Sequence, residues 1–223
     1  MGDLVNANPD VSPYAMSVGQ ALLIPNADAT PATLPTIEPQ ALSFYPPNCY
    51  ATLSAGMWCF VLVQNDSDVA LEGISLDVRL FDPAGNLLSN ETAFLLQDRL
   101  LAGDAQPALV YFEGMPANSH AQANVLTAFE GKPDDARYPD VRLLAVFTQI
   151  AWDAKTAQVN GELLVDGEDA VDVWVVATVY DSKNDVVGVR RWESIEGEKA
   201  FRLMVASLGP EIERISLSVE AHR

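Results

Sequence analysis

The side chains that could carry out chemistry in this chain are few and widely spaced. Its two histidines, His120 and His222, lie in a polar loop and beside the C-terminus, and neither belongs to a motif that would give a histidine an acid–base role. Acidic residues on a turn between strands are more often solvated than catalytic, so we predict that the chain has no catalytic residues. The acidic run that could otherwise supply the paired carboxylates of a glycoside hydrolase is Asp166, Glu168, Asp169 and Asp172.

The familiar motifs of enzymes and cofactor sites are missing from the sequence. It contains no G-x-S-x-G nucleophile elbow, no HExxH or CxxC metal spacing and no Gly-rich phosphate-binding loop. The sequence therefore predicts a protein without enzymatic activity, bound metal or cofactor, and a carbohydrate-active enzyme is the least favoured alternative. Calcium binding at acidic hairpin turns is left open, although no EF-hand loop with alternating oxygen ligands is present.

Two cysteines, Cys49 and Cys59, are the remaining candidates for covalent chemistry. An even number of cysteines at short spacing predicts one structural disulfide. Two buried free thiols would also fit, because cysteine behaves as a small hydrophobic residue. A disulfide closing a loop of this size would stabilise the fold by roughly 2–3 kcal/mol on the chain-entropy model. It would also indicate an oxidising compartment.

The composition limits the partners of the chain. Of its 223 residues, 31 are acidic and 13 are basic, which gives a formal net charge of −18. Such a chain repels phosphate backbones, and its one adjacent basic pair is Arg190 and Arg191, so we expect no nucleic-acid binding. The longest apolar run, residues 57–63, is far shorter than a membrane span, so we expect no membrane insertion.

The elements that would position any site are predicted to be β-strands. Residues 74–80 alternate apolar and polar side chains, which is the period-two pattern of a strand with one buried face. A tight turn follows at residues 82–86, where proline and glycine favour chain reversal. The same pattern recurs later, where an alternating strand at residues 171–179 leads into a turn at residues 182–185.

Matching landmarks indicate two copies of one antiparallel module. Phe81-Asp82 and Tyr180-Asp181 each place an aromatic residue and an aspartate at the mouth of a hairpin. A carboxylate at this position can accept hydrogen bonds from the backbone N–H groups of the turn. We therefore predict an all-β chain with two antiparallel β-sandwiches in tandem, at residues 42–131 and 138–223.

The start of the chain resembles the second half of a LysM peptidoglycan-binding module. Such modules end with an asparagine-rich helix, a Gly-containing turn and a strand reading L-x-I-P, and residues 3–25 follow this order. The first strand and helix of the module are missing, so we expect the chain to begin inside a domain. A complete module would bind peptidoglycan or a related N-acetylglucosamine glycan. The resemblance implies a glycan-binding remnant at Asn6, Asn8, Pro9 and Gly19.

The segment after this remnant is predicted to be a spacer. Prolines recur through residues 26–41, and proline fixes φ and removes backbone donors, which favours an extended, semi-rigid chain.

The body resembles tandem modules of the FxLYD-like, immunoglobulin-like class of bacterial envelope proteins. Residues 78–82 and 177–181 carry this resemblance. It implies immunoglobulin-like sandwiches that act as spacer or recognition modules in a secreted or envelope-associated, extracytoplasmic protein. We therefore expect a non-catalytic cell-envelope protein with LysM-type attachment. The alternative is an interaction or adhesion module that binds another envelope protein through edge strands or exposed aromatic residues.

Overall fold

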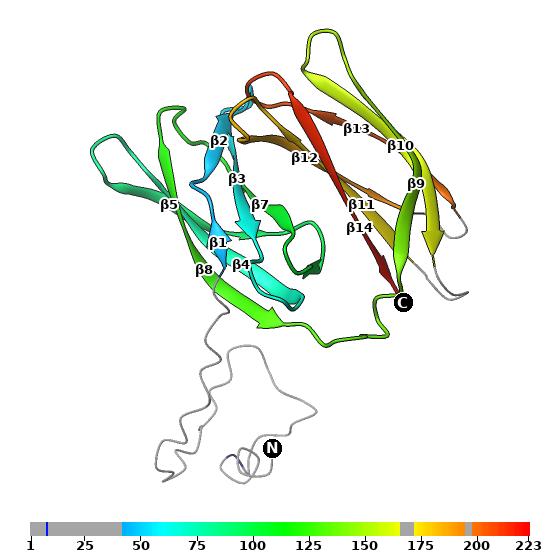
Figure 1. Cartoon of the computed structure of the whole chain (residues 1–223). Coiled ribbons are helices and arrows are strands. Elements are labelled where there is room, and N and C mark those ends of the chain that lie inside the picture. Colours follow the sequence, from blue (N-terminus) through cyan, green and yellow to red (C-terminus); the bar gives the residue numbers. More distant parts are fainter. Residues whose placement is uncertain (1–7, 9–41, 166–171, 195–197) are drawn as a thin grey trace. The chain divides into compact units, whose positions relative to one another are not determined.

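The computed structural model describes residue 8 and residues 42–165, 172–194 and 198–223. Backbone contacts divide the chain into two units, Met1–Glu38 and Pro39–Arg223. The described residues form several antiparallel sheets and no helix, which confirms the predicted all-β class (Figure 1). Among these residues there is accordingly no helix that could span a membrane. Apart from Asn8, the predicted LysM-like segment and spacer lie outside the described residues.

Eight strands in the first half of the described chain form one antiparallel sheet. Its order is β1-β3-β7-β5-β4-β6, with β2 paired to β3 and β8 paired to β4. We call residues 42–130 module 1. Its strands are β1 Ser43–Phe44, β2 Asn48–Ala51, β3 Met57–Gln64, β4 Leu71–Phe81, β5 Leu87–Phe94, β6 Arg99–Leu100, β7 Ala105–Phe112 and β8 His120–Glu130.

Six strands in the second half form two three-stranded antiparallel sheets. Their orders are β13-β10-β9 and β12-β11-β14. We call residues 141–222 module 2. Its strands are β9 Val141–Ile150, β10 Thr156–Val165, β11 Asp172–Tyr180, β12 Val186–Glu193, β13 Ala200–Ala206 and β14 Arg214–His222.

The two modules share one pairing scheme. Strand β3 pairs with β2 and β7 as β10 pairs with β9 and β13, and β4 pairs with β5 and β8 as β11 pairs with β12 and β14. Met57 faces the last residue of β2, and Ala157 faces the last residue of β9. Counted from these pairs, Phe60 corresponds to Asn160, which stands just before a register shift in β10 between Asn160 and Glu162. The registers also match the Phe81 and Tyr180 landmarks.

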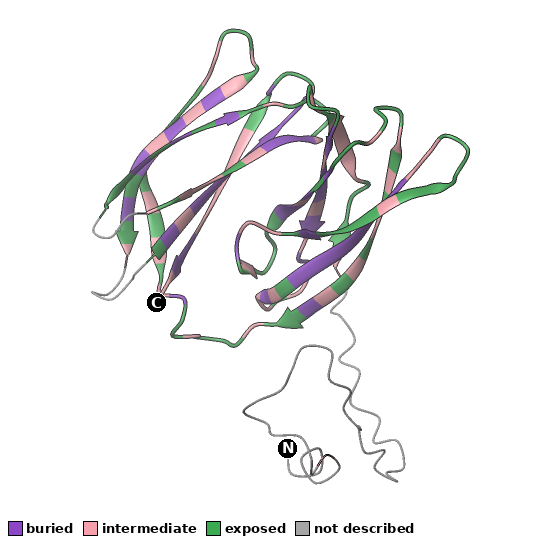
Figure 2. Ribbon diagram, turned by 180° about the vertical axis from the view of Figure 1, so that it is seen from behind, coloured by how far each residue is buried: buried purple, intermediate pink, exposed green. Residues whose placement is uncertain are grey.

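Each module has its own apolar core, and Figure 2 shows buried stretches along the strands of both. Burying one such side chain contributes about 1.5–3 kcal/mol relative to exposure. The opposite face of β4 is less open than its alternation suggests, because Asp77 is also buried and accepts a hydrogen bond from Arg79 Nε at 2.6 Å. The alternating residues of β4 that enter the core of module 1 are Ile74, Leu76, Val78 and Leu80.

The aspartates at the two hairpin mouths make the same turn. Asp82 Oδ1 accepts from the backbone N–H groups two and four residues ahead, both at 2.8 Å. Asp181 Oδ1 does the same at 2.8 and 3.0 Å. The Asn86 side chain also donates to Asp82, which lowers the pKa of that carboxyl below its ordinary value. Both carboxylates thus serve their own backbone turns, as the sequence suggested.

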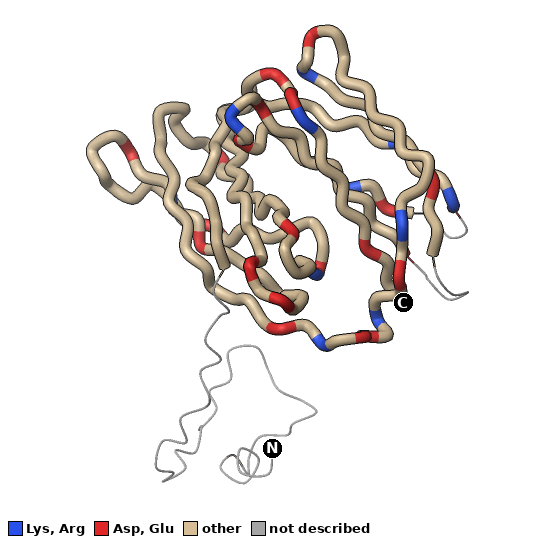
Figure 3. The backbone as a smooth tube through the Cα atoms, viewed as in Figure 1, with Lys and Arg blue, Asp and Glu red and all other residues tan. Residues whose placement is uncertain are grey.

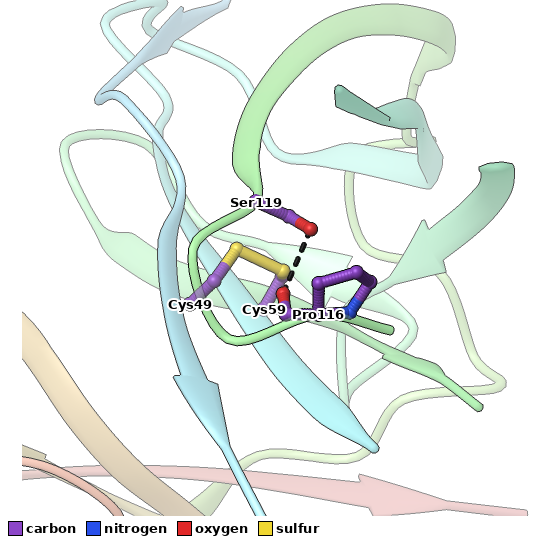
Figure 4. The surroundings of a disulfide bond; sticks show 4 residues. All are labelled: Cys49, Cys59, Pro116 and Ser119. Carbon is purple, nitrogen blue, oxygen red and sulfur yellow. Dashed lines mark hydrogen bonds between the residues drawn. A yellow bond between two sulfur atoms is a disulfide. The ribbon is translucent and has the colours of Figure 1, made fainter. Parts of the chain in front are cut away.

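Cys49 and Cys59 are joined by a disulfide with an S–S distance of 2.04 Å. The two residues lie directly opposite each other on β2 and β3. Figure 4 shows the loop between β7 and β8 beside the sulfur atoms. In that loop Ser119 Oγ donates to the Pro116 carbonyl at 2.8 Å. The disulfide therefore fixes the short strand β2 to its neighbour β3 within module 1.

Candidate functional site

The two modules meet in a shared apolar cluster. Phe60 from module 1 and Tyr180 from module 2 are both buried in it. Alternate residues of β3 face the core of module 1, and the others face module 2. A strand covered on both faces has a nearly continuous apolar sequence, which accounts for the run at residues 57–63. The other members of the cluster are Val186, Tyr50, Trp58, Leu62, Leu109 and Val189.

A buried carboxylate fastens module 2 to module 1. Glu220 on β14 is 4% exposed, and its two oxygens accept from the backbone N–H groups of Asp98 and Arg99 at 2.9 and 3.0 Å. Arg99 Nε lies 3.4 Å from Oε2, and His222 Nε2 lies 2.9 Å from Oε1. Hydrogen bonds to an ionised carboxylate are about twice as strong as neutral ones. Glu220 therefore acts as a latch between the modules.

The latch contains residue types that could bind a metal. Asp98, Glu220 and His222 place one ligand atom each within 4.8 Å of the others, which is the one such group among the described residues. The oxygens of Glu220 are already engaged by backbone donors. His222 Nδ1 is buried and lacks the second hydrogen bond that metal-bound histidines usually make. The contacts fit a structural latch better than a metal centre.

Aromatic and guanidinium groups extend the latch along the junction. The Trp174 ring lies 4.0 Å from the His222 ring, and the Arg191 guanidinium carbon lies 4.2 Å from the Trp174 ring centre. Arg191 Nη1 also donates to the Leu96 carbonyl of module 1 at 3.0 Å. A cation over an indole contributes about 0.5–1 kcal/mol at exposed sites and more when desolvated. These contacts bind the sheet β12-β11-β14 to the loop after β5.

The segment that joins the modules is itself tied down. Arg137 Nη2 donates to the Glu72 carboxylate at 2.9 and 3.2 Å and to Asp135 at 2.7 Å. Hydrogen bonds from Arg137 lower the pKa of Asp135 to about 2. The Arg99 guanidinium carbon lies 4.0 Å from the ring centre of Tyr138, and burial raises the pKa of Tyr138. The joining segment therefore contacts module 1 closely.

A further contact joins β2 to the aspartate turn of module 2. Asn48 Nδ2 donates to Asp185 Oδ1 at 3.2 Å. The Tyr50 ring covers Gly209 so closely that a Cβ there would lie 2.1 Å from a ring carbon. Burial, followed by the charges of Asp181 and Asp185, raises the pKa of Tyr50 from 10.0 to about 12.

This raised pKa predicts an alkaline instability of the junction. Unfolded tyrosine ionises near pH 10, so the stability from neutral Tyr50 is fully present below that pH and is lost as the pH rises toward about 12. Burial also raises the pKa values of Tyr138 and Tyr180, so we expect late tyrosinate absorbance that Tyr50→Phe reduces, together with part of the stability loss. Replacing the exposed Tyr45 by phenylalanine is the control. Late absorbance unchanged in Tyr50→Phe would contradict the prediction.

An open cleft of about 570 Å³ lies beside the apolar cluster, between the modules. Its walls are mainly aromatic and aliphatic, with a few polar groups, which is the usual character of a recognition site. The exposed Arg190 lines it and has no ion pair within the described residues. The apolar side chains that line the cleft include Trp58, Phe60, Leu109, Met204 and Leu208. This cleft is the candidate site.

The four tryptophans have different roles. Trp58 and Trp174 lie at the junction, so they cover an interface. Trp192 packs beside Phe201 at the core of module 2, with ring centres 5.9 Å apart. Trp152 is 99% exposed in the turn between β9 and β10. Of the four, only Trp152 exposes its whole indole ring to solvent.

Of the sequence-predicted site residues, the structure brings Cys49 and Cys59 together in the disulfide. Asn6, Pro9 and Gly19 lie outside the described residues, and Asn8 is half-buried and in no strand. His120 stacks on Phe81 with ring centres 5.5 Å apart. The acidic run lies outside the described residues except for its last member, which begins β11 and is exposed.

Sequence reasoning missed the junction. Its signal was present in β3 and β11, which carry apolar residues on both faces. No family model matches the chain, and no curated protein matches its sequence.

Proposed function

We propose that the chain is a non-catalytic, extracytoplasmic cell-envelope protein. In this proposal two immunoglobulin-like β-sandwiches of the FxLYD-like class follow a LysM-type attachment segment. The repeated pairing scheme and the repeated aspartate turn support the tandem modules. The disulfide supports an oxidising compartment, since such bonds persist mainly outside the cytosol.

The observation that carries the proposal is the junction. A buried apolar cluster and the Glu220 latch fasten the modules to each other, whereas modules on a flexible chain would share few contacts. A fastened pair suits a spacer that holds a recognition surface in a fixed orientation. The contacts of the two histidines support structural roles, since His120 stacks on Phe81 and His222 bonds to Glu220 within the latch.

A pull-down on insoluble peptidoglycan tests this proposal. It compares the full chain, residues 42–223 alone, and an extended version in which a complete LysM module precedes residue 26. We expect only the extended version to bind. Binding by residues 42–223 alone would move recognition to the β-modules, and no binding by any version would overturn the attachment.

A second candidate function is binding to another envelope protein through an edge strand. Among the described strands β9 pairs on one side only, with β10, and its Leu144, Val146 and Phe147 are exposed. An exposed apolar edge is a ready template for a strand of another chain. Replacing Val146 by lysine should then abolish capture of that partner without changing the melting temperature.

A further inference from the structure

The turn between β9 and β10 presents a rigid apolar tip. Trp152 is 99% exposed there, although the turn backbone is well bonded. Ala154 accepts from the Ile212 N–H at 2.7 Å and donates to the Ala151 carbonyl at 2.9 Å. Asp153 Oδ1 accepts a hydrogen bond from the backbone N–H of Lys155 at 3.0 Å. A fixed turn loses little entropy when it binds, so this tip is already organised for a partner.

The candidate cleft between the modules is a matching hollow. Trp58, Met204 and Leu208 give it apolar walls, and its volume of about 570 Å³ exceeds the space that one indole needs. Arg190 lines it without an ion pair among the described residues. Asp153, next to the exposed Trp152, likewise has no ion pair in the part of the chain described. The cleft is therefore large enough for the indole of the tip, and the charges of Arg190 and Asp153 are opposite.

Tip and cleft both adjoin the loop at residues 207–213. Leu208 of that loop lines the cleft, while its Ser207 N–H bonds to the Lys155 carbonyl and its Ile212 N–H bonds to the tip. A dimer in which two copies exchange their tips would therefore place its two-fold axis near this loop. Such an interface uses the same surface on both copies and closes on itself.

We propose that the cleft receives the Trp152-Asp153 tip of a second copy of this chain. In this dimer each indole packs against Trp58 and Met204, and each Asp153 carboxylate pairs with Arg190 of the other copy. The inference goes beyond the proposed function, because it rests on residues 42–223 and not on glycan attachment. If no dimer forms, the proposed LysM-type glycan attachment is not affected.

The contact area of the proposed dimer is small. A tryptophan buries roughly 150–250 Å², so two tips and the walls they cover bury roughly 800 Å², less than the roughly 1,000 Å² of a stable interface and in the range of a weak, transient one. Acidic residues lie throughout both modules (Figure 3), so the copies repel each other at low salt. At physiological salt the Debye length is about 8 Å, so the long-range repulsion between the copies is screened. The direct contact between Arg190 and Asp153 is shorter than this length and is screened less. We expect a weak dimer, formed between roughly 10 µM and 1 mM.

Sedimentation equilibrium of the full chain over this concentration range tests the proposal. Trp152→Ala should weaken the dimer by roughly thirtyfold or more, as expected for a central tryptophan. The matched control is Leu53→Ala, since Leu53 is equally exposed at the corresponding turn of module 1. This control should change the dissociation constant less than about twofold.

A charge exchange tests the pairing independently of folding. Arg190→Asp and Asp153→Arg should each weaken the dimer roughly tenfold, and the double variant should recover it, because both copies then carry the reversed pair. A chain that stays monomeric to about 1 mM would overturn the proposal, as would a dimer that Trp152→Ala leaves unchanged. A monomer whose Trp152 emission shifts only with phosphatidylcholine vesicles would also overturn it and assign the tip to lipid.

Discussion

Replacing Glu220 by alanine is expected to lower the free energy of unfolding by about 3–5 kcal/mol, the usual cost of breaking a buried charged network. Glu220 is 4% exposed and accepts the backbone N–H groups of Asp98 and Arg99. Without it, both N–H groups and the Arg99 guanidinium lose their partner where water has little access. Each orphaned buried donor costs about 1–3 kcal/mol.

Urea unfolding of the full chain measures this loss. Glu213→Ala is the matched control, because Glu213 precedes the same strand and is exposed, so its removal should change stability by less than about 0.5 kcal/mol. Glu220→Gln keeps the shape and should fall between the two. If Glu220→Ala unfolds like the control, the latch does not hold the modules together.

The features of this fold that depend on residues close together in the sequence could be predicted. Alternation at residues 74–80 gave a strand, and the aspartates at positions 82 and 181 gave turns whose carboxylates bond to their own backbone. These features depend on neighbours within a few residues, so local rules of period and turn chemistry suffice to find them.

The junction could not be predicted in the same way. Ser216, Ser218 and Glu220 alternate with apolar residues on β14, a pattern that indicates a solvated face, yet Glu220 is buried against module 1. Its partners are backbone N–H groups of residues far away in the chain, and any residue type carries those groups. A carboxylate that binds backbone N–H groups therefore cannot be predicted from the residue types of its partner segment.

The outward faces of the two matched strands, β3 and β10, differ in polarity. Trp58, Phe60 and Leu62 face the junction from β3, whereas the corresponding residues of β10 are polar. Repeat units require a polar outer face where the array ends. The junction between the two modules is therefore apolar, and the outward face of β10 in module 2 faces solvent. The polar residues of β10 at the matched positions are Gln158, Asn160 and Glu162.

Exchanging the matched residues tests this assignment directly. Phe60→Asn gives β3 the residue of β10 and should destabilise the chain by about 3–5 kcal/mol, since it removes a buried aromatic ring and leaves an amide in an apolar cluster. The reverse change, Asn160→Phe, adds an aromatic ring to a partly exposed face and should alter stability by less than about 1 kcal/mol.

Calorimetry separates loss of the junction from loss of a module. If the junction joins two modules that each have their own core, Phe60→Asn should split one transition into two, because each core can then melt alone. Asn160→Phe should keep a single transition at nearly the original temperature. Equal effects of the two exchanges would show that the outward face of β3 is no more covered than that of β10, and the junction would then contribute little to stability.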